Sequence, residues 1–201
     1  SGLSMHEIID AIIEGAVQAG IPRNPDFNGK SQEGVGYYQA TVNKGRRWSA
    51  SAAYLKPARN RRNLVVTPNA HATRILVENG RAVGVEYRTS RGLETARARG
   101  EVIVSGGVYG SPQLLMLSGL GPAEHLRSHG IEVVRDMPGV GSNLHDHFNT
   151  YIAYKCAQPV TMNDLANSFS RRVLAGLQYA FGRTGPLASM GLYVGALVRS
   201  D

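Results

Sequence analysis

The glycine pair in Ser105-Gly106-Gly107 is the feature of the sequence best suited to hold a ligand. It follows an apolar run and precedes a segment that can form a helix. Glycine has no side chain to keep a ligand away, and the free backbone N–H groups at a helix start favour phosphate. Glycine turns also occur without any ligand, so the function of this turn has to be judged from the secondary structure predicted around it.

A second candidate is the triplet His145-Asp146-His147, because imidazole and carboxylate groups are common metal ligands. Its spacing supplies no third histidine and no second shell of partners, so we expect no metal site. A general base is recognised by its position against a substrate, and nothing in the sequence gives a histidine that position. We therefore name no catalytic residue, and the other histidines are not candidates either: His6, His71, His125 and His129.

Short runs rich in β-branched residues precede the glycine pair. They predict strands over residues 64–67, 72–77, 82–87 and 94–97, and Asn79-Gly80 is a strong hairpin signal between the second and the third. The last three should form an antiparallel meander. The run from Glu101 to Gly107 differs, because its apolar residues are continuous, as expected for a strand covered on both faces.

A helix should follow the glycine pair. Ser111 can serve as its N-cap and Pro112 as its first residue, with the helical segment over 113–117 and an end near Gly119. A meander, a covered strand, a glycine turn and a helix are the order expected of a nucleotide-binding α/β sheet with an antiparallel insertion before its last strand. The usual G-x-G-x-x-G turn is not found in that context.

The flanking segments show helical and extended patterns. A capping box at Ser4–Glu7 should start a helix that Gly20 and Pro22 stop, and turn-forming residues predict a loop over 24–36. Further elements are expected as a short helix over 49–55, another from Pro122 to just before Gly130, a strand over 149–155, and a helix over 163–181. The last should bury one stripe: Leu165, Phe169, Val173, Leu177 and Ala180.

Composition predicts a folded, soluble chain. No apolar run approaches the roughly 18 residues that a membrane span needs, and Cys156, the one cysteine, fits a reducing compartment as a buried thiol. The formal net charge of +7 could attract nucleic acid. The arginines fall in separate segments, however, and no nucleic-acid motif accompanies them, so we expect no specific nucleic-acid partner.

Two motifs resemble those of a known family. Gly110-Ser-Pro-Gln-Leu-Leu-Met-Leu-Ser-Gly-Leu-Gly-Pro122 is similar to the second signature of the glucose-methanol-choline (GMC) oxidoreductases, and Pro138-Gly-Val-Gly-Ser-Asn-Leu-His-Asp-His147 resembles the loop that follows it there. The resemblance extends from Asp26-Phe-Asn-Gly29 to Arg199-Ser-Asp201 and is strongest to bacterial choline-dehydrogenase-like members. Val108 departs from it, because the family signature usually has a smaller residue there.

The resemblance implies a two-domain protein that holds FAD and oxidises the CH–OH group of an alcohol by hydride transfer to the flavin. In fold class it implies α/β with α+β, with residues 63–148 as part of the FAD domain and residues 1–62 and 149–201 as parts of the substrate domain. The cofactor contacts implied are the main chain of Ala72 at the adenine and Gly106 and Gly107 beside the adenosine.

The resemblance also places Asn143, Asp146 and His147 near the active-site side. It puts the catalytic histidine beyond Asp201 and the dinucleotide turn before Ser1, so we expect an internal fragment that is inactive alone, from a cytoplasmic protein of a bacterium. The alternative is a binding or interaction module that keeps the family's sequence without its chemistry.

Overall fold

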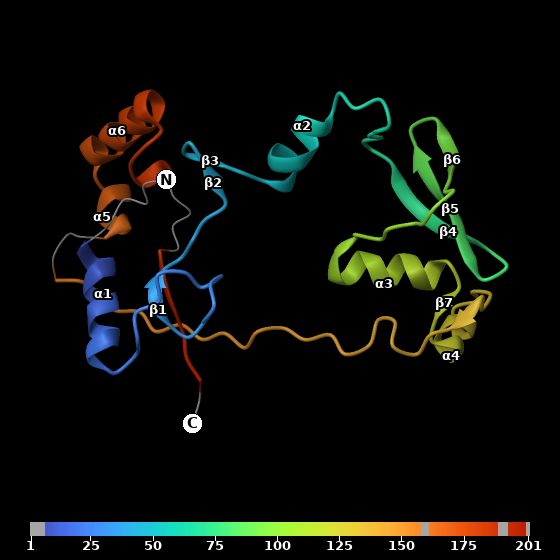
Figure 1. Ribbon diagram of the computed structural model, residues 1–201, viewed down its shortest axis with the longest axis horizontal. Coiled ribbons are helices and arrows are strands. Elements are labelled where there is room, and N and C mark those ends of the chain that lie inside the picture. The colour runs from blue at the N-terminus through green and yellow to red at the C-terminus, as the bar shows by residue number, and fades with distance from the viewer. Residues whose placement is uncertain (1–6, 158–160, 189–192, 200–201) are drawn as a thin grey trace. The chain divides into compact units, whose positions relative to one another are not determined.

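The computed structural model describes residues 7–157, 161–188 and 193–199, and the chain divides into two compact units (Figure 1). Unit 1 combines residues 1–64 with 152–201, and unit 2 comprises residues 65–151. Helices and mostly antiparallel two- and three-stranded sheets make up the chain, so the mixed α and β class expected from the sequence is confirmed. In the described residues, no helix has the length and apolar character needed to cross a membrane.

An antiparallel meander forms the centre of unit 2. Strands β4 (His71–Glu78), β5 (Arg81–Thr89) and β6 (Gly92–Arg97) pair in that order, with Ile75 opposite Val85. The β4–β5 turn has positive φ at both central residues, 51° at Asn79 and 77° at Gly80, which Asn-Gly adopts readily. The predicted meander and its hairpin are therefore confirmed.

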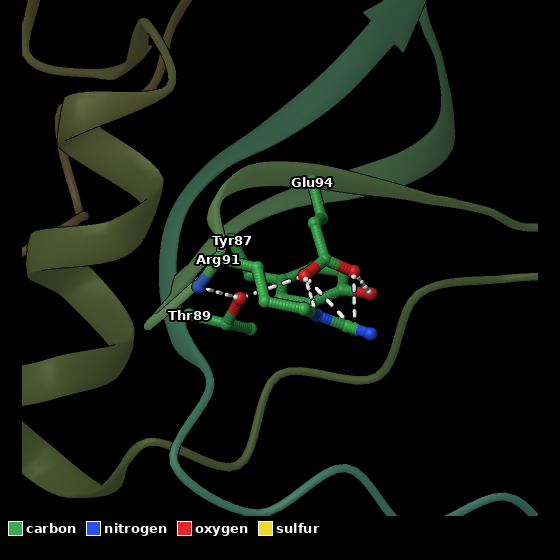
Figure 2. Close-up of polar contacts among 4 residues, drawn as sticks. All are labelled: Tyr87, Thr89, Arg91 and Glu94. Carbon is green, nitrogen blue, oxygen red and sulfur yellow. Dashed lines mark hydrogen bonds and ion pairs between the residues drawn. The ribbon is translucent and has the colours of Figure 1, made fainter.

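A polar cluster closes the β5–β6 turn (Figure 2). Glu94 accepts hydrogen bonds from the Thr89 hydroxyl at 2.7 Å, from the Arg91 guanidinium at 3.1 and 3.2 Å, and from the Tyr87 hydroxyl at 3.4 Å. The Thr89 hydrogen bond is the largest of several causes that hold the pKa of Glu94 below its ordinary value. The carboxylate thus stabilises the hairpin in its ionised form.

The Thr89→Val substitution should destabilise the chain at neutral pH and have a smaller effect in acid. A carboxyl whose pKa is lowered by folding adds stability above its unfolded pKa, and that stability is lost as the pH falls through the folded pKa. Removing the hydroxyl shrinks this shift in Glu94. Urea unfolding at neutral pH and at about pH 3, which lies below the ordinary Glu pKa, measures the difference.

Glu94→Gln is the matched control, because it removes the titrating group and leaves the turn sequence otherwise intact. In that background, Thr89→Val should have the same effect at both pH values. A Thr89→Val effect that does not change with pH in the native background would contradict the role assigned to this hydrogen bond.

The remainder of unit 2 packs around helix α3 (Gly107–Leu117) and helix α4 (Ala123–Ser128), with β7 (Leu120–Gly121) parallel to β8 (Arg135–Asp136). Ser118 is buried and joins α3 to the meander. Its hydroxyl donates to the Leu114 carbonyl at 2.6 Å and accepts from the Ile75 N–H at 2.8 Å. The α4 prediction is confirmed, since Gly130 with φ of 69° lies just past its end.

Helix α3 begins earlier than predicted. Its first residue is Gly107, so Pro112 lies inside the helix and Ser111 is not the N-cap. The Ser111 hydroxyl instead accepts a hydrogen bond from the Gly106 N–H at 2.9 Å, one turn back. Proline is common at the first position of a helix, where its missing N–H costs nothing. Here Pro112 lies more than one turn inside α3, and the helix continues without that N–H.

Three strand predictions are wrong, because the predicted segments have no strand partner in the described part of the chain. They cover residues 64–67, 101–107 and 149–155. Ile103, expected in a strand covered on both faces, is 79% exposed. An apolar run is suited to a sheet, but a strand forms only where a neighbour supplies the other half of the hydrogen bonds. The run therefore predicts the extended backbone without predicting the pairing.

Unit 1 has its core where helix α1 (Glu7–Gln18) packs against the antiparallel pair β1 (Gly34–Tyr37) and β9 (Val194–Leu197). The buried residues there are Ile9, Ile13, Val35 and Tyr193. The predicted helix is confirmed as α1, and it ends before Gly20 as expected. The predicted capping box at Ser4–Glu7 includes residues outside the described ones. The loop predicted over 24–36 is wrong at its end, because β1 starts at Gly34 and its partner lies far away in sequence.

A tyrosine on β1 is tied to α1. The Tyr37 hydroxyl donates to Asp10 Oδ1 at 2.5 Å. Desolvation and this carboxylate raise the pKa of Tyr37 to about 12, so the hydroxyl keeps its proton, and remains a donor, at neutral pH.

The other elements of unit 1 are short. Strands β2 (Val42–Asn43) and β3 (Arg46–Arg47) form a hairpin, and the π-helix η1 (Ser51–Leu55) continues into α2 (Lys56–Ala58). The helix predicted over 49–55 is confirmed and runs three residues further. Cys156 is only partly buried, so the prediction of a buried thiol is wrong.

The single helix predicted over 163–181 is wrong. The structure has α5 (Met162–Ala166), α6 (Phe169–Leu177) and the π-helix η2 (Gln178–Gly182), followed by the 3₁₀ helix η3 (Pro186–Ala188). Ser168 is extended and separates α5 from α6. Most of the predicted stripe is exposed, with Phe169 at 75%, and Ala175 is the buried residue of α6.

Candidate functional site

The predicted glycine turn lies at the start of α3. Gly106 is the N-cap, and Gly107, the first helical residue, has a positive φ of 81°. A Cβ added to Gly106 would lie 3.0 Å from the Gly110 carbonyl carbon and 3.1 Å from the Ser111 nitrogen, so the helix backbone leaves little room for a side chain there. A Cβ added to Gly107 would meet no atom within 4 Å. The turn is therefore open on the Gly107 side.

The start of α3 also presents hydrogen-bond donors. The first backbone N–H groups of a helix have no acceptor within the helix, and here the Ser111 hydroxyl satisfies the one at Gly106. The backbone N–H groups of the residues that follow Gly106 point out of the N-terminal end of the helix. Ser111 was predicted only as a cap, so its hydrogen bond to the Gly106 N–H was missed.

Ala72 lies on β4, opposite Tyr87 of β5. The order β4-β5-β6 places β4 at an edge of the sheet, so the main-chain groups on its outer side take no part in the ladder. The register shifts between Ala72 and Arg74, which bends the strand at this point. Ala72 is itself an exposed residue of this edge strand.

The predicted residues lie on two elements that are in contact. β4 and α3 pack together, and the Ile75–Ser118 hydrogen bond joins them at the C-terminal end of α3. Gly106 and Gly107 lie at the opposite end of that helix. Among the described residues, no hydrogen bond links Ala72 directly to the glycine turn.

The loop with Asn143, Asp146 and His147 is exposed. Asn143 has a positive φ of 57°, and the Asp146 carboxylate accepts a hydrogen bond from the His147 N–H at 2.7 Å, so the loop is held by local contacts. Within the described ranges, no group of three or more His, Cys, Asp or Glu side chains is placed to hold a metal ion.

A hollow of about 420 Å³ in unit 1 was not predicted from the sequence. Asn24 lies in its wall, and its side chain donates to the carbonyls of Ser31 and Glu33 at 2.8 and 3.1 Å and accepts from the Asp26 N–H at 2.9 Å. The buried amide is therefore occupied in shaping the loop. None of the predicted cofactor contacts lines this hollow.

Comparison with known proteins gives close relatives. The chain is 45% identical over 193 residues to the oxygen-dependent choline dehydrogenase of Brucella ovis, which covers 96% of this chain and 35% of that protein. It is 44% identical over 200 residues to the mitochondrial choline dehydrogenase of Homo sapiens, covering 100% of this chain and 34% of that protein. The chain thus spans about a third of the length of the curated relatives it matches.

Solved structures share the fold. Formate oxidase of Aspergillus oryzae matches with 26% identity and a TM-score of 0.78, over 95% of this chain and 34% of that one. An FAD-dependent oxidoreductase from Chaetomium thermophilum matches with a TM-score of 0.78 over 94% of this chain and 34% of that one, at 22% identity, which supports the fold alone.

The model of one protein family matches most of the sequence, including both motifs singled out above. That model is described as GMC oxidoreductase, and it matches residues 2–149. Together with the identity to choline dehydrogenases, this match shows that the chain belongs to the GMC oxidoreductase family.

Proposed function

We propose that this chain is an internal part of an FAD-dependent oxidoreductase that oxidises the CH–OH group of an alcohol. The observation that carries the proposal is the 45% identity over 96% of the chain to an oxygen-dependent choline dehydrogenase. When bound, FAD supplies the ring system that accepts a hydride from the alcohol carbon. Choline is the alcohol to test first, because the names of the relatives point to it.

The described residues fit the adenosine part of FAD. An adenine can hydrogen-bond to main-chain atoms, and Ala72 is an exposed residue of the edge strand β4. A ribose or phosphate can approach a backbone without obstruction at the open side of Gly107. The role of these residues would be to bind and orient the cofactor, with no proton transfer assigned to them.

The domain assignment is part of the same proposal. Residues 63–148 would belong to the FAD domain, and residues 1–62 and 149–201 to the substrate domain. The division of the chain into one unit of residues 65–151 and another of residues 1–64 with 152–201 supports it.

The 201-residue chain should not bind FAD tightly by itself. The sequence holds no G-x-G-x-x-G turn in the context that grips a pyrophosphate, so most contacts to that group are missing. A titration of the chain into FAD, followed by flavin fluorescence, should show no stoichiometric endpoint, and no alcohol should be oxidised. A sharp endpoint at one FAD per chain would overturn this expectation.

We also propose a bacterial cytoplasmic setting, supported by the bacterial organisms of the first relatives. The human relative is named as mitochondrial, so the compartment is a property to be measured. Fractionation of the source cells, with detection by an antibody against the chain, tests it.

A further inference from the structure

Two histidine side chains lie against each other at the end of helix α4 (Figure 1). His125 is a residue of the helix, and His129 is its C-cap. Their ring centroids are 4.7 Å apart, and the ring planes meet at 73°. Both residues are exposed, so a dissolved ion can reach them. In the described part of the chain, no other two histidine rings are in contact.

The spacing of the two histidines explains why their rings meet. Residues four apart in a helix lie one turn apart on the same face, and two histidines at this spacing can bind one zinc ion. Two imidazoles that bind one ion at about 2 Å, with an angle of about 90–110° between the bonds, have ring centroids about 4.5–5.2 Å apart. The measured separation lies in this range. The rings of His125 and His129 thus have the spacing that a shared ion requires.

The backbone that carries the two rings is fixed by the packing of α4. Leu126, next to His125, is fully buried, and its N–H donates to the Pro122 carbonyl at 2.9 Å. The Leu126 carbonyl accepts from the N–H groups of His129 and Ile131 at 3.1 and 2.9 Å, which closes the end of the helix. Little backbone freedom is then lost when both rings bind one ion, and this preorganisation favours binding.

The chemistry of the two ligands selects the class of ion. Neutral imidazole binds Zn²⁺, Cu²⁺ and Ni²⁺ well, whereas Mg²⁺ and Ca²⁺ prefer oxygen ligands. Among the described residues, no third His, Cys, Asp or Glu side chain joins the pair. Water would therefore complete the coordination of the ion.

We propose that His125 and His129 form a two-histidine site for a divalent transition-metal ion. The triplet His145-Asp146-His147 lacks this arrangement, because its histidines are two residues apart in a loop. Folding of α4 brings the two rings together, so an ion that binds both favours the folded state over the unfolded chain. The proposal goes beyond the proposed function and does not rest on it.

Calorimetric titration with Zn²⁺ tests the site in the 201-residue chain, prepared without a histidine tag. Every protein in the comparison carries Cys156→Ser, so that the free thiol cannot supply a ligand. We expect one Zn²⁺ per chain, tighter binding of Cu²⁺, and no binding of Mg²⁺ at the same concentration. Zn²⁺ should also raise the urea concentration at the midpoint of unfolding.

Matched variants separate this pair from the other histidines. His125→Gln and His129→Gln should each weaken Zn²⁺ binding by about a hundredfold, the advantage of two linked ligands over one. The control carries His145→Gln and His147→Gln together and should bind Zn²⁺ as tightly as the native pair. Zn²⁺ should raise the urea midpoint of this control and of neither single variant. Circular dichroism establishes that each variant is folded.

Three results would overturn the proposal. These are no binding of Zn²⁺, a single-histidine variant that binds Zn²⁺ as tightly as the native pair does, and a loss in the double control as large as in the single variants. The last would assign the ion to the loop triplet. Binding of Mg²⁺ as tight as that of Zn²⁺ would also contradict the proposal, because it would show that imidazole is not the ligand.

Discussion

Gly119→Val should lower the free energy of unfolding by about 2–5 kcal/mol. About 1–2 kcal/mol of this comes from placing valine in a left-handed backbone conformation, and about 1–3 kcal/mol comes from overpacking. Gly119 has φ of 81°, and its carbonyl accepts from the N–H groups of Val134 and Arg135 at 2.9 and 3.1 Å. A Cβ there would lie 2.5 Å from the Glu132 carbonyl oxygen and 2.7 Å from Val134 Cγ2. Urea unfolding followed by circular dichroism measures the loss.

Gly130→Val is the control for the backbone term. Gly130 also has a positive φ, of 69°, but a Cβ there would meet nothing within 4 Å. Its valine variant should lose only the strain, about 1–2 kcal/mol. If the two variants unfold at the same urea concentration, the crowding around Gly119 has no energetic consequence and the account of this junction is wrong.

Leu126→Ala should cost about 2–5 kcal/mol, the range for truncating a fully buried leucine. Leu126 on α4 has 0% exposure, and it is the largest of the side chains that the described structure buries fully. A Cβ added to Gly121 of β7 would lie 3.6 Å from Leu126 Cδ2, at ordinary van der Waals distance, so the leucine packs beside this strand. Alanine would leave a cavity there.

Leu117→Ala tests the same chemical change at the surface. Leu117 ends α3 and is 51% exposed, so its truncation should cost well under 1 kcal/mol, as most surface changes do. Thermal and urea unfolding of both variants give the comparison. A loss for Leu117→Ala as large as that for Leu126→Ala would show that exposure does not rank these positions.

Local signals predicted local structure well. Asn79-Gly80 specified its hairpin because both residues accept positive φ at low cost, and Pro122 with Gly130 bounded α4 for equally local reasons. Strand pairings between segments far apart in the sequence were missed. The β1–β9 pair joins Gly34–Tyr37 to Val194–Leu197. A strand of four residues has too short a pattern of apolar and polar residues to identify a partner so distant in the sequence.

The same physics explains the strands that did not form. Residues 101–106 have the composition of a covered strand, yet Ile103 is exposed because the described residues supply no neighbouring strand. The glycine turn shows the same division. Its place before a helix was predicted from the sequence, while the contact of Gly106 and Gly107 with a cofactor stays a prediction. The hydrogen bond from the Gly106 N–H to the Ser111 hydroxyl was missed, because Pro112 was predicted to be the first residue of a helix that in fact begins at Gly107.

The residues of the family signature make contacts that hold unit 2 together. Gly110–Pro122 contains the buried Ser118 hydroxyl, the crowded Gly119 and the approach of Gly121 to Leu126. These contacts join the C-terminal end of α3 to β4 and to the segment that leads into β8, and they join β7 to α4. The motif thus holds together the elements that carry Ala72 and the glycine turn, which are the residues proposed to contact the cofactor.

The most direct test of the central proposal is the absorption spectrum of the purified product of the whole reading frame that encodes this chain. We expect the visible bands of a flavin at close to one per polypeptide, bleached when choline or another alcohol is added without oxygen. The Gly107→Val variant should hold less flavin than Gly130→Val. A purified, folded protein without flavin, or a flavin that no alcohol reduces, would contradict the assignment of this chain to an FAD-dependent alcohol oxidoreductase.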